Sequence, residues 1–216
     1  MKLPIQTFLG ILLILLSITG LAQNGGAEML EAAKRGNLET LKKKLDKGAP
    51  VDYQDQAGRT ALIEAAYWGH EEIVEFLLER GANVEATDNT GRTALIAAAN
   101  PGHTGIVKAL LTKGASGNAR NKSGRTALLE AAENGRLDTV KALLESSVDI
   151  NVKSSEGRTA LMLAAYWGRP KVVQTLIEKG VKVDEKDNSG YTALDYARSM
   201  KHTEIIELLS NVNAKK

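Results

Sequence analysis

One pentapeptide recurs through the chain at constant spacing. Gly-Arg-Thr-Ala-Leu stands at 58–62, 91–95, 124–128 and 157–161, and a fifth copy with Tyr in place of Arg stands at 190–194. Each copy begins 33 residues after the one before it. A fixed period of this length is typical of repeat proteins, in which stacked units contact only their neighbours. We therefore expect the chain to grow by stacking units and not by enlarging one core.

The unit at 58–90 carries the signals for two short helices. The first is expected to begin after Thr60, whose hydroxyl can accept a hydrogen bond from an amide further on, and to end at Gly69. The second is expected to begin at Glu71, where a carboxylate suits the helix dipole, and to end at Gly81. Apolar residues at helical spacing give each helix one buried face: Leu62, Ala65 and Ala66 in the first, and Ile73, Val74, Leu77 and Leu78 in the second.

This order of turn, helix, helix and extended return resembles the ankyrin repeat. The resemblance extends from about residue 26 to the end and is carried by Gly58, Thr60, Leu62, Ala65-Ala66, Gly69-His70, Ile73-Val74, Leu77-Leu78 and Gly81-Ala82. It departs from the family pattern at Ala61 and Ile63, which replace Pro and His. It implies an all-α ankyrin-repeat solenoid of helix-turn-helix units joined by short β-hairpin-like fingers. Ankyrin arrays mostly bind proteins, so it also implies a protein-protein interaction scaffold.

The ends of the array are marked by polar residues at positions that are apolar elsewhere. Lys44 opens a column that is otherwise Leu, and Arg198 closes a column that is otherwise Ala. Terminal repeats need such polar outer faces because no neighbour covers them. The expected ankyrin domain is therefore 23–216, with a first cap at 26–57, internal repeats at 58–90, 91–123, 124–156 and 157–189, and a last cap at 190–216.

Ser147 interrupts a column of helix-ending glycines. The other members are Gly48, Gly81, Gly114 and Gly180. If the column is left-handed, Ser147 is strained there, and Ser147→Gly is predicted to stabilise the protein by about 1 kcal/mol.

Residues 1–22 have the pattern of a secretory signal peptide. A basic start at Lys2 is followed by an apolar stretch from 5 to 16, and Gly20 and Ala22 supply small residues before a cut after Ala22. The mature chain would then begin at Gln23 and be exported, to a bacterial periplasm or to the medium. The alternative is an uncleaved signal anchor, although the apolar stretch is short for a span of about 20 residues.

The composition and motifs argue against several classes of function. The net charge of +2 is too small for a general nucleic-acid binder. With no cysteine, the chain cannot form disulfides, thiolate metal sites or Cys nucleophiles. His70, His103 and His202 share one column at the start of the second helix, and stacked units lie about 10 Å apart, so neighbouring members cannot share a metal. We expect a non-enzymatic monomer with no cofactor, no metal, and no membrane association after signal cleavage.

Two columns are candidates for partner recognition. One is an arginine ladder of Arg59, Arg92, Arg125 and Arg158, which either contacts acidic side chains of a partner or, as we favour, pairs with nearby Asp and Glu within the array. The other holds both tryptophans, in the dipeptides Tyr67-Trp68 and Tyr166-Trp167. These rings either line the concave binding surface typical of the family or pack over the neighbouring repeat.

The two tryptophans are 99 residues, or three repeats, apart. At about 10 Å per unit they would lie about 30 Å apart, a span that fits a protein partner and not a small ligand. A secreted effector or toxin-neutralising protein is the alternative to a periplasmic scaffold. A carbohydrate-binding or enzymatic groove is a third.

Overall fold

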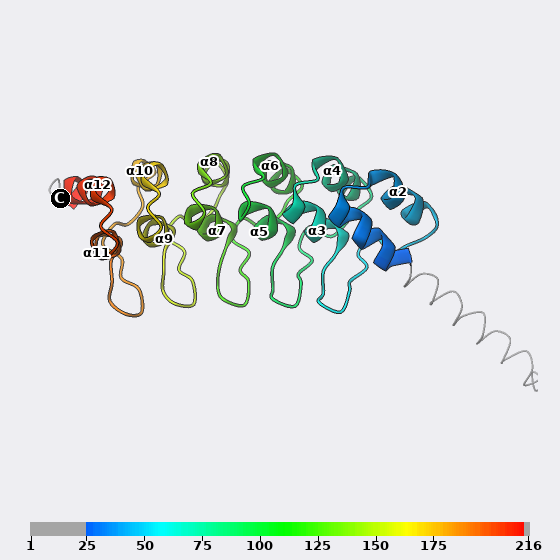
Figure 1. Ribbon diagram of the computed structural model, residues 1–216, viewed down its shortest axis with the longest axis horizontal. Coiled ribbons are helices and arrows are strands. Elements are labelled where there is room, and N and C mark those ends of the chain that lie inside the picture. The colour runs from blue at the N-terminus through cyan, green and yellow to red at the C-terminus, as the bar shows by residue number, and fades with distance from the viewer. Residues whose placement is uncertain (1–24, 214–216) are drawn as a thin grey trace, which may run out of the picture.

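The computed structural model describes residues 25–213 as a row of paired helices (Figure 1). The described part of the first unit pairs a helix over 25–35 with α2 (Leu38–Asp46). The following inner helices are α3 (Ala61–Trp68), α5 (Ala94–Ala99), α7 (Ala127–Glu133), α9 (Ala160–Tyr166) and α11 (Ala193–Ser199). Their outer partners are α4 (Glu71–Glu79), α6 (Thr104–Thr112), α8 (Leu137–Leu144), α10 (Pro170–Glu178) and α12 (Thr203–Asn213). The expected all-α ankyrin-repeat solenoid is confirmed.

The fingers between units project along the edge opposite the outer helices (Figure 1). In the first finger the amide of Asp55 donates to the carbonyl of Arg59 over 3.2 Å, and the amide of Gly58 donates back to Asp55 over 2.9 Å. The next finger is tied to it by the amide of Asn89, which donates to the carbonyl of Ala57 over 2.8 Å. None of the residues from 25 to 213 forms a β-strand, so the fingers are hairpin-like turns without a sheet.

Each inner helix of the repeats from 58 onward begins at the threonine of the pentapeptide. The hydroxyl of Thr60 accepts a hydrogen bond from the amide of Ile63 over 3.2 Å. Thr93, Thr126, Thr159 and Thr192 make the same contact in their own repeats. This cap satisfies one of the amides that a helix leaves free at its start, and it confirms the predicted helix starts.

From α4 onward, the residue before each outer helix fastens its unit to the preceding one through a hydrogen bond, here called the clamp. His70 donates from Nε2 to the carbonyl of Lys34 over 3.0 Å, and His103 donates to that of Tyr67 over 3.1 Å. His202 makes the same contact, while Arg136 and Arg169 donate from Nε at their equivalent positions. The three histidines therefore have a structural role in joining neighbouring units.

Glycine is required beneath each of these clamps. Gly69 ends α3 in the left-handed region at φ 82°. A Cβ on Gly69 would lie 2.4 Å from Cε1 of the His103 ring. The position therefore excludes larger residues twice, through its backbone angle and through the close approach of the next unit.

The core runs through the whole array as one row of small and aliphatic side chains. All six residues of α5 are buried, and four of them are alanines. Alanine lets neighbouring inner helices approach closely and is also the best helix former. At the first unit Lys44 pairs with Glu28, and at the last unit Arg198 is exposed.

The expectation for Ser147 was wrong. Gly48, Gly81, Gly114 and Gly180 have φ of 87°, 79°, 89° and 79°, but Lys201 is the only non-glycine residue between 25 and 213 with positive φ. Helix α8 ends at Leu144, and the Ser146 hydroxyl donates to the carbonyl of Leu143 over 2.6 Å. The chain leaves the helix by this different turn, so Ser147→Gly has no left-handed strain to relieve.

The predicted signal peptide lies outside the described residues. Within residues 25–213, no helix is both long enough and apolar enough to span a bilayer.

Candidate functional site

The structure places the two Tyr-Trp dipeptides in the same way. Tyr67 and Trp68 end α3, and Tyr166 and Trp167 stand at the end of α9. In both pairs the rings meet edge to face with centroids 5.3 Å apart. Both Trp side chains remain 49% exposed, so neither is covered by the adjacent repeat.

The pair in the first internal repeat is held by charged neighbours. The Trp68 indole donates from Nε1 to Glu64 over 3.0 Å. Glu64 is only 4% exposed, and its other oxygen lies 2.9 Å from Nη1 of Arg59. From the next repeat, the guanidinium of Arg92 lies over the Tyr67 ring at 5.2 Å. Both aromatic rings are therefore held in place by charged side chains of the protein itself.

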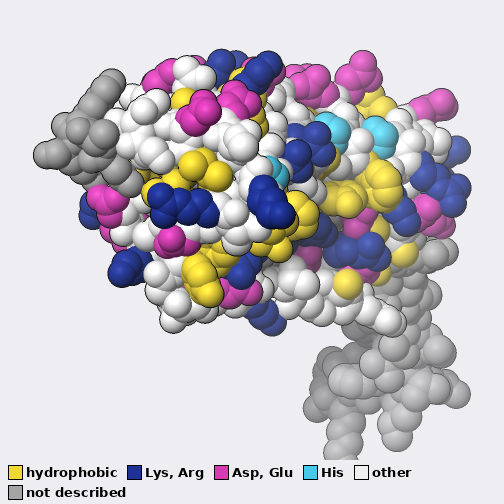
Figure 2. Space-filling model, turned by 60° about the vertical axis from the view of Figure 1, so that its left-hand side comes forward, with side chains coloured by type: hydrophobic (Ala, Val, Ile, Leu, Met, Phe, Trp, Pro, Cys, Tyr) yellow, Lys and Arg dark blue, Asp and Glu magenta, His cyan; other side chains and the backbone are white. Residues whose placement is uncertain are grey.

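The pair in the fourth internal repeat is extended by two further tyrosines. The ring of Tyr166 meets that of Tyr196 edge to face at 5.6 Å, and Tyr196 lies 5.7 Å from Tyr191. Trp167, Tyr166, Tyr196 and Tyr191 thus form a continuous line of rings, here called the aromatic row. Figure 2, with the C-terminal end turned forward, shows hydrophobic side chains interspersed with Lys and Arg over the visible face.

Sequence reasoning missed the second half of the aromatic row. The sequence feature that could have indicated it is Tyr191, which replaces Arg in the fifth pentapeptide. Tyr191 is 52% exposed, and Met200, which follows Trp167 by one repeat in the same column, is 44% exposed. The exposed apolar surface therefore continues into the last unit.

The members of the arginine ladder form ion pairs with carboxylates of the protein itself. Arg59 contacts Asp55 at 2.6 Å as well as Glu64. Arg92 donates from Nε to Asp88 over 3.2 Å, and Arg125 contacts Glu130 at 2.6 Å and also Glu133. Arg158 lies 3.3 Å from Glu156, so all four arginines make intramolecular ion pairs, as the sequence favoured.

These contacts shift the pKa values of the groups involved. Burial alone would raise the pKa of Asp55, but hydrogen bonds from the Arg59 side chain and from the amides of Arg59 and Ala57 bring it below its usual value. Burial would likewise lower the pKa of Arg125, which Glu130 and Glu133 nevertheless hold above its usual value. Both shifts favour the charged forms, as expected for groups whose ion-pair partners outweigh the cost of burial.

The column of the tryptophans holds no aromatic residue in the two repeats between them. The Trp column holds Pro101 and Asn134 there, and Asn100 donates to Glu130 over 2.8 Å. The two aromatic sites are thus separate, with a hydrogen-bonded stretch between them.

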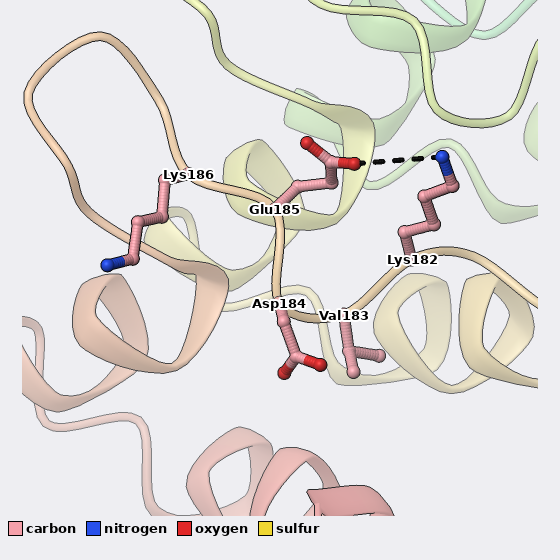
Figure 3. Close-up of a pocket in the computed structure, with 5 residues that line it drawn as sticks. All are labelled: Lys182, Val183, Asp184, Glu185 and Lys186. Atoms are coloured by element: carbon pink, nitrogen blue, oxygen red, sulfur yellow. Dashed lines mark ion pairs between the residues drawn. The ribbon is translucent and has the colours of Figure 1, made fainter.

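The described surface has several open depressions. One, of about 310 Å³, is lined by residues 182–186 after α10 (Figure 3). Glu185 there lies 2.6 Å from Lys153 and 3.9 Å from Lys182, so its charge is already compensated. Within the described part of the chain, no three His, Asp or Glu side chains are grouped as metal ligands.

The chain matches the family described as ankyrin repeats (3 copies) over residues 11–88, 29–121, 80–154 and 147–216. These matches cover more than half of the sequence, so the chain belongs to the ankyrin-repeat family. Ankyrin repeats indicate a protein-protein interaction scaffold, and the family is typically non-enzymatic. No curated protein matches the chain.

Proposed function

We propose that the protein is a non-catalytic scaffold that binds a partner protein on its inner face, the surface formed by the exposed sides of the inner helices and by the fingers. One observation carries this proposal. The large hydrophobic residues that are exposed among residues 25–213 all lie on inner helices, at their ends or in a finger, and none lies on an outer helix: Tyr67, Trp68, Trp167, Tyr191 and Met200.

The chemistry of these residues suits a protein partner. Tyr and Trp are enriched among binding hot spots because they bury a large rigid area on contact. Exposed apolar surface of this kind, bordered by polar residues, is typical of interaction sites. Trp68 and Trp167 stand three repeats apart, about 30 Å, which is within the footprint of a protein and beyond that of a small ligand.

The experiment is a crosslinking pull-down of the mature protein from its own envelope fraction, with Trp68→Ala and Trp167→Ala beside the wild type. We expect both variants to lose the captured partner. The matched control is Glu75→Ala, which changes an exposed residue of the outer helix α4 and should leave capture unchanged. Capture that survives both Trp changes and fails in Glu75→Ala would assign binding to the outer helices instead.

We further propose that residues 1–22 direct export and are removed, which leaves a chain that begins at Gln23 in the periplasm. The support is the basic, apolar and small-residue order of this segment. Ala22→Arg should block processing because the peptidase accepts only small residues there. Intact-mass analysis of fractionated cells tests this: a mass that retains Met1 would indicate an uncleaved anchor, and protein found in the medium would indicate secretion.

A further inference from the structure

Arg158 differs from the other three members of the arginine ladder. The one carboxylate within ion-pair distance is that of Glu156, 3.3 Å from Nη1, and the Glu156 side chain is itself 69% exposed. Nε of Arg158 is buried and has no hydrogen-bond partner, and it is the only such side-chain atom among residues 25–213. Because Nε is buried, a partner can reach only the terminal nitrogens, but the side chain is 38% exposed and its one carboxylate neighbour is in solvent, so a further anion can approach the guanidinium.

The sequence of this repeat explains the difference. The column that supplies Asp55 to Arg59 and Asp88 to Arg92 holds Ser154 before Arg158. The column that supplies Glu64 to Arg59 and Glu130 to Arg125 holds a leucine at 163. The column of Glu133, which also pairs with Arg125, holds Tyr166. All three carboxylate positions that neutralise other members of the ladder are thus occupied by uncharged residues around Arg158.

Arg158 also lies against the aromatic row. Its guanidinium is 5.6 Å from the centre of the Tyr196 ring. The nearby carboxylate of Asp187 is occupied: it accepts hydrogen bonds from the amides of Ser189 and Tyr191 and from the Tyr196 hydroxyl. The site therefore combines an incompletely paired cation with a line of partly exposed aromatic rings.

We propose that Arg158 and the aromatic row form the docking site for a partner segment in which a carboxylate stands beside a large apolar side chain. This inference rests on the proposed scaffold function and specifies the chemistry of its partner. The guanidinium donates paired hydrogen bonds to the carboxylate of the segment. The rings of Trp167 and Tyr191 contact the apolar side chain.

The first aromatic site, formed by Tyr67 and Trp68, has no arginine that lacks a buried carboxylate partner, so it serves as the internal comparison. Arg92 lies over Tyr67 much as Arg158 lies over Tyr196, but its Nε donates to Asp88, whose side chain is only 5% exposed. A partner carboxylate there would compete with a buried one that is already in place. The acidic preference is therefore assigned to Arg158 and not to the ladder as a whole.

The test uses three capped synthetic octapeptides that differ at single positions. The first carries Trp-Glu at its centre, the second Trp-Gln and the third Ser-Glu, in an otherwise identical Gly/Ser sequence. Binding to the mature protein is measured by NMR titration, with the arginine Nε–H signals as the site-specific readout. We expect the Trp-Glu peptide to shift the Arg158 signal and to bind about fivefold more tightly than the Trp-Gln peptide. The Ser-Glu peptide should bind most weakly.

Variants then assign the effect to Arg158. Arg158→Gln should abolish the difference between the Trp-Glu and Trp-Gln peptides, and the matched change Arg92→Gln should preserve it. Glu156→Gln removes the competing carboxylate without changing the guanidinium, so the Trp-Glu peptide should bind about threefold more tightly to it. This gain is measurable even if Arg158→Gln does not fold.

Several outcomes would overturn the inference: no binding by any peptide, equal affinity for Trp-Glu and Trp-Gln, or discrimination that persists in Arg158→Gln. The inference would also be overturned if inorganic phosphate, at equal concentration, shifted the Arg158 signal as strongly as the Trp-Glu peptide. Arg158 would then bind any anion, without a contribution from the aromatic row. If discrimination fails while partner capture still requires Trp68 and Trp167, only this inference falls. If capture is independent of both tryptophans, the proposed function falls whatever the peptides show.

Discussion

The two Tyr-Trp pairs have the same geometry and different surroundings. The rings are 5.3 Å apart in each pair, at interplanar angles of 87° and 85°. Trp68 is bound by Glu64, whereas the equivalent neighbour of Trp167 is Leu163, which cannot accept a hydrogen bond. The repeat thus sets where a side chain lies, and single substitutions one turn away set what it can bind.

Removing each tryptophan should separate binding from stability. We expect Trp68→Ala and Trp167→Ala each to weaken partner binding by about 2 kcal/mol or more, against less than about 1 kcal/mol for Arg92→Gln. The loss should be greater for Trp167, because the aromatic row extends its contact surface. Binding is measured by calorimetry with the captured partner.

The stability reference for these variants is Leu128→Ala. Leu128 is 1% exposed, so its truncation should lower the free energy of unfolding by about 2–5 kcal/mol. Either Trp variant should lose less than this in urea unfolding. Trp variants that melt several degrees lower but bind normally would show that the pairs are packing elements.

The glycines beneath the clamps should respond alike in both regions. Gly168 has φ 65°, and a Cβ there would lie 2.7 Å from the His202 ring. We expect Gly168→Ala and Gly69→Ala each to cost about 2 kcal/mol of stability, from the backbone angle and the displaced ring together. The control is Gly180→Ala, where φ is 79° but the space is open, so that only about 1 kcal/mol is expected. Equal losses in urea unfolding at Gly168 and Gly180 would contradict a role for the ring.

Acid should weaken both sites through their finger carboxylates. Burial alone would raise the pKa of Asp187, but hydrogen bonds from Tyr196 and from the amides of Tyr191 and Ser189 bring it below its usual value. Because the folded-state pKa is lower than the unfolded one, this stabilisation is complete above about pH 4 and is lost as the pH falls further.

Asp187→Asn tests this linkage at the aromatic row. We expect the variant to lose about 1 kcal/mol at pH 7, because the amide is a weaker acceptor than the carboxylate. It should also lose less additional stability than the wild type between pH 7 and pH 3 in urea unfolding. An unchanged difference between the two pH values would show that Asp187 does not contribute to acid sensitivity.

The sequence was sufficient to predict the fold because the repeat determines it locally. The threonine caps follow from one residue type at one position in the period, whereas the contacts before the outer helices are made by His in three repeats and by Arg in two. The helix ends were predicted equally well where glycine was present. At Ser147 the inference failed, because Ser146 offered the chain a different hydrogen bond to Leu143.

Only part of the candidate site could be predicted, because the rest depends on contacts between side chains of different repeats. The Tyr-Trp pairs are visible as dipeptides, but the aromatic row joins rings from two repeats, and the ring of Tyr196 reaches Tyr166 from 30 positions away. The four ladder arginines look equivalent in the sequence. Arg158 is distinguished by uncharged residues at the three columns that supply carboxylates to the other arginines, and these columns can be recognised only once the side-chain contacts are known.

The smallest expected effect comes from Glu64→Leu, which gives the first aromatic site the residue found at 163. Arg59 would keep Asp55 at 2.6 Å and is 38% exposed, so the loss of stability should stay below about 1 kcal/mol. Trp68 would lose the acceptor for its indole N–H, and the hydrogen-exchange rate of that proton should rise to match that of Trp167. The Trp-Glu peptide should still show no preference for this site, because Asp55 continues to occupy Arg59. A new carboxylate preference at Arg59 would contradict this. It would show that the buried Glu64 alone accounts for the difference in carboxylate preference between the two sites, and not the missing carboxylates together with the aromatic row.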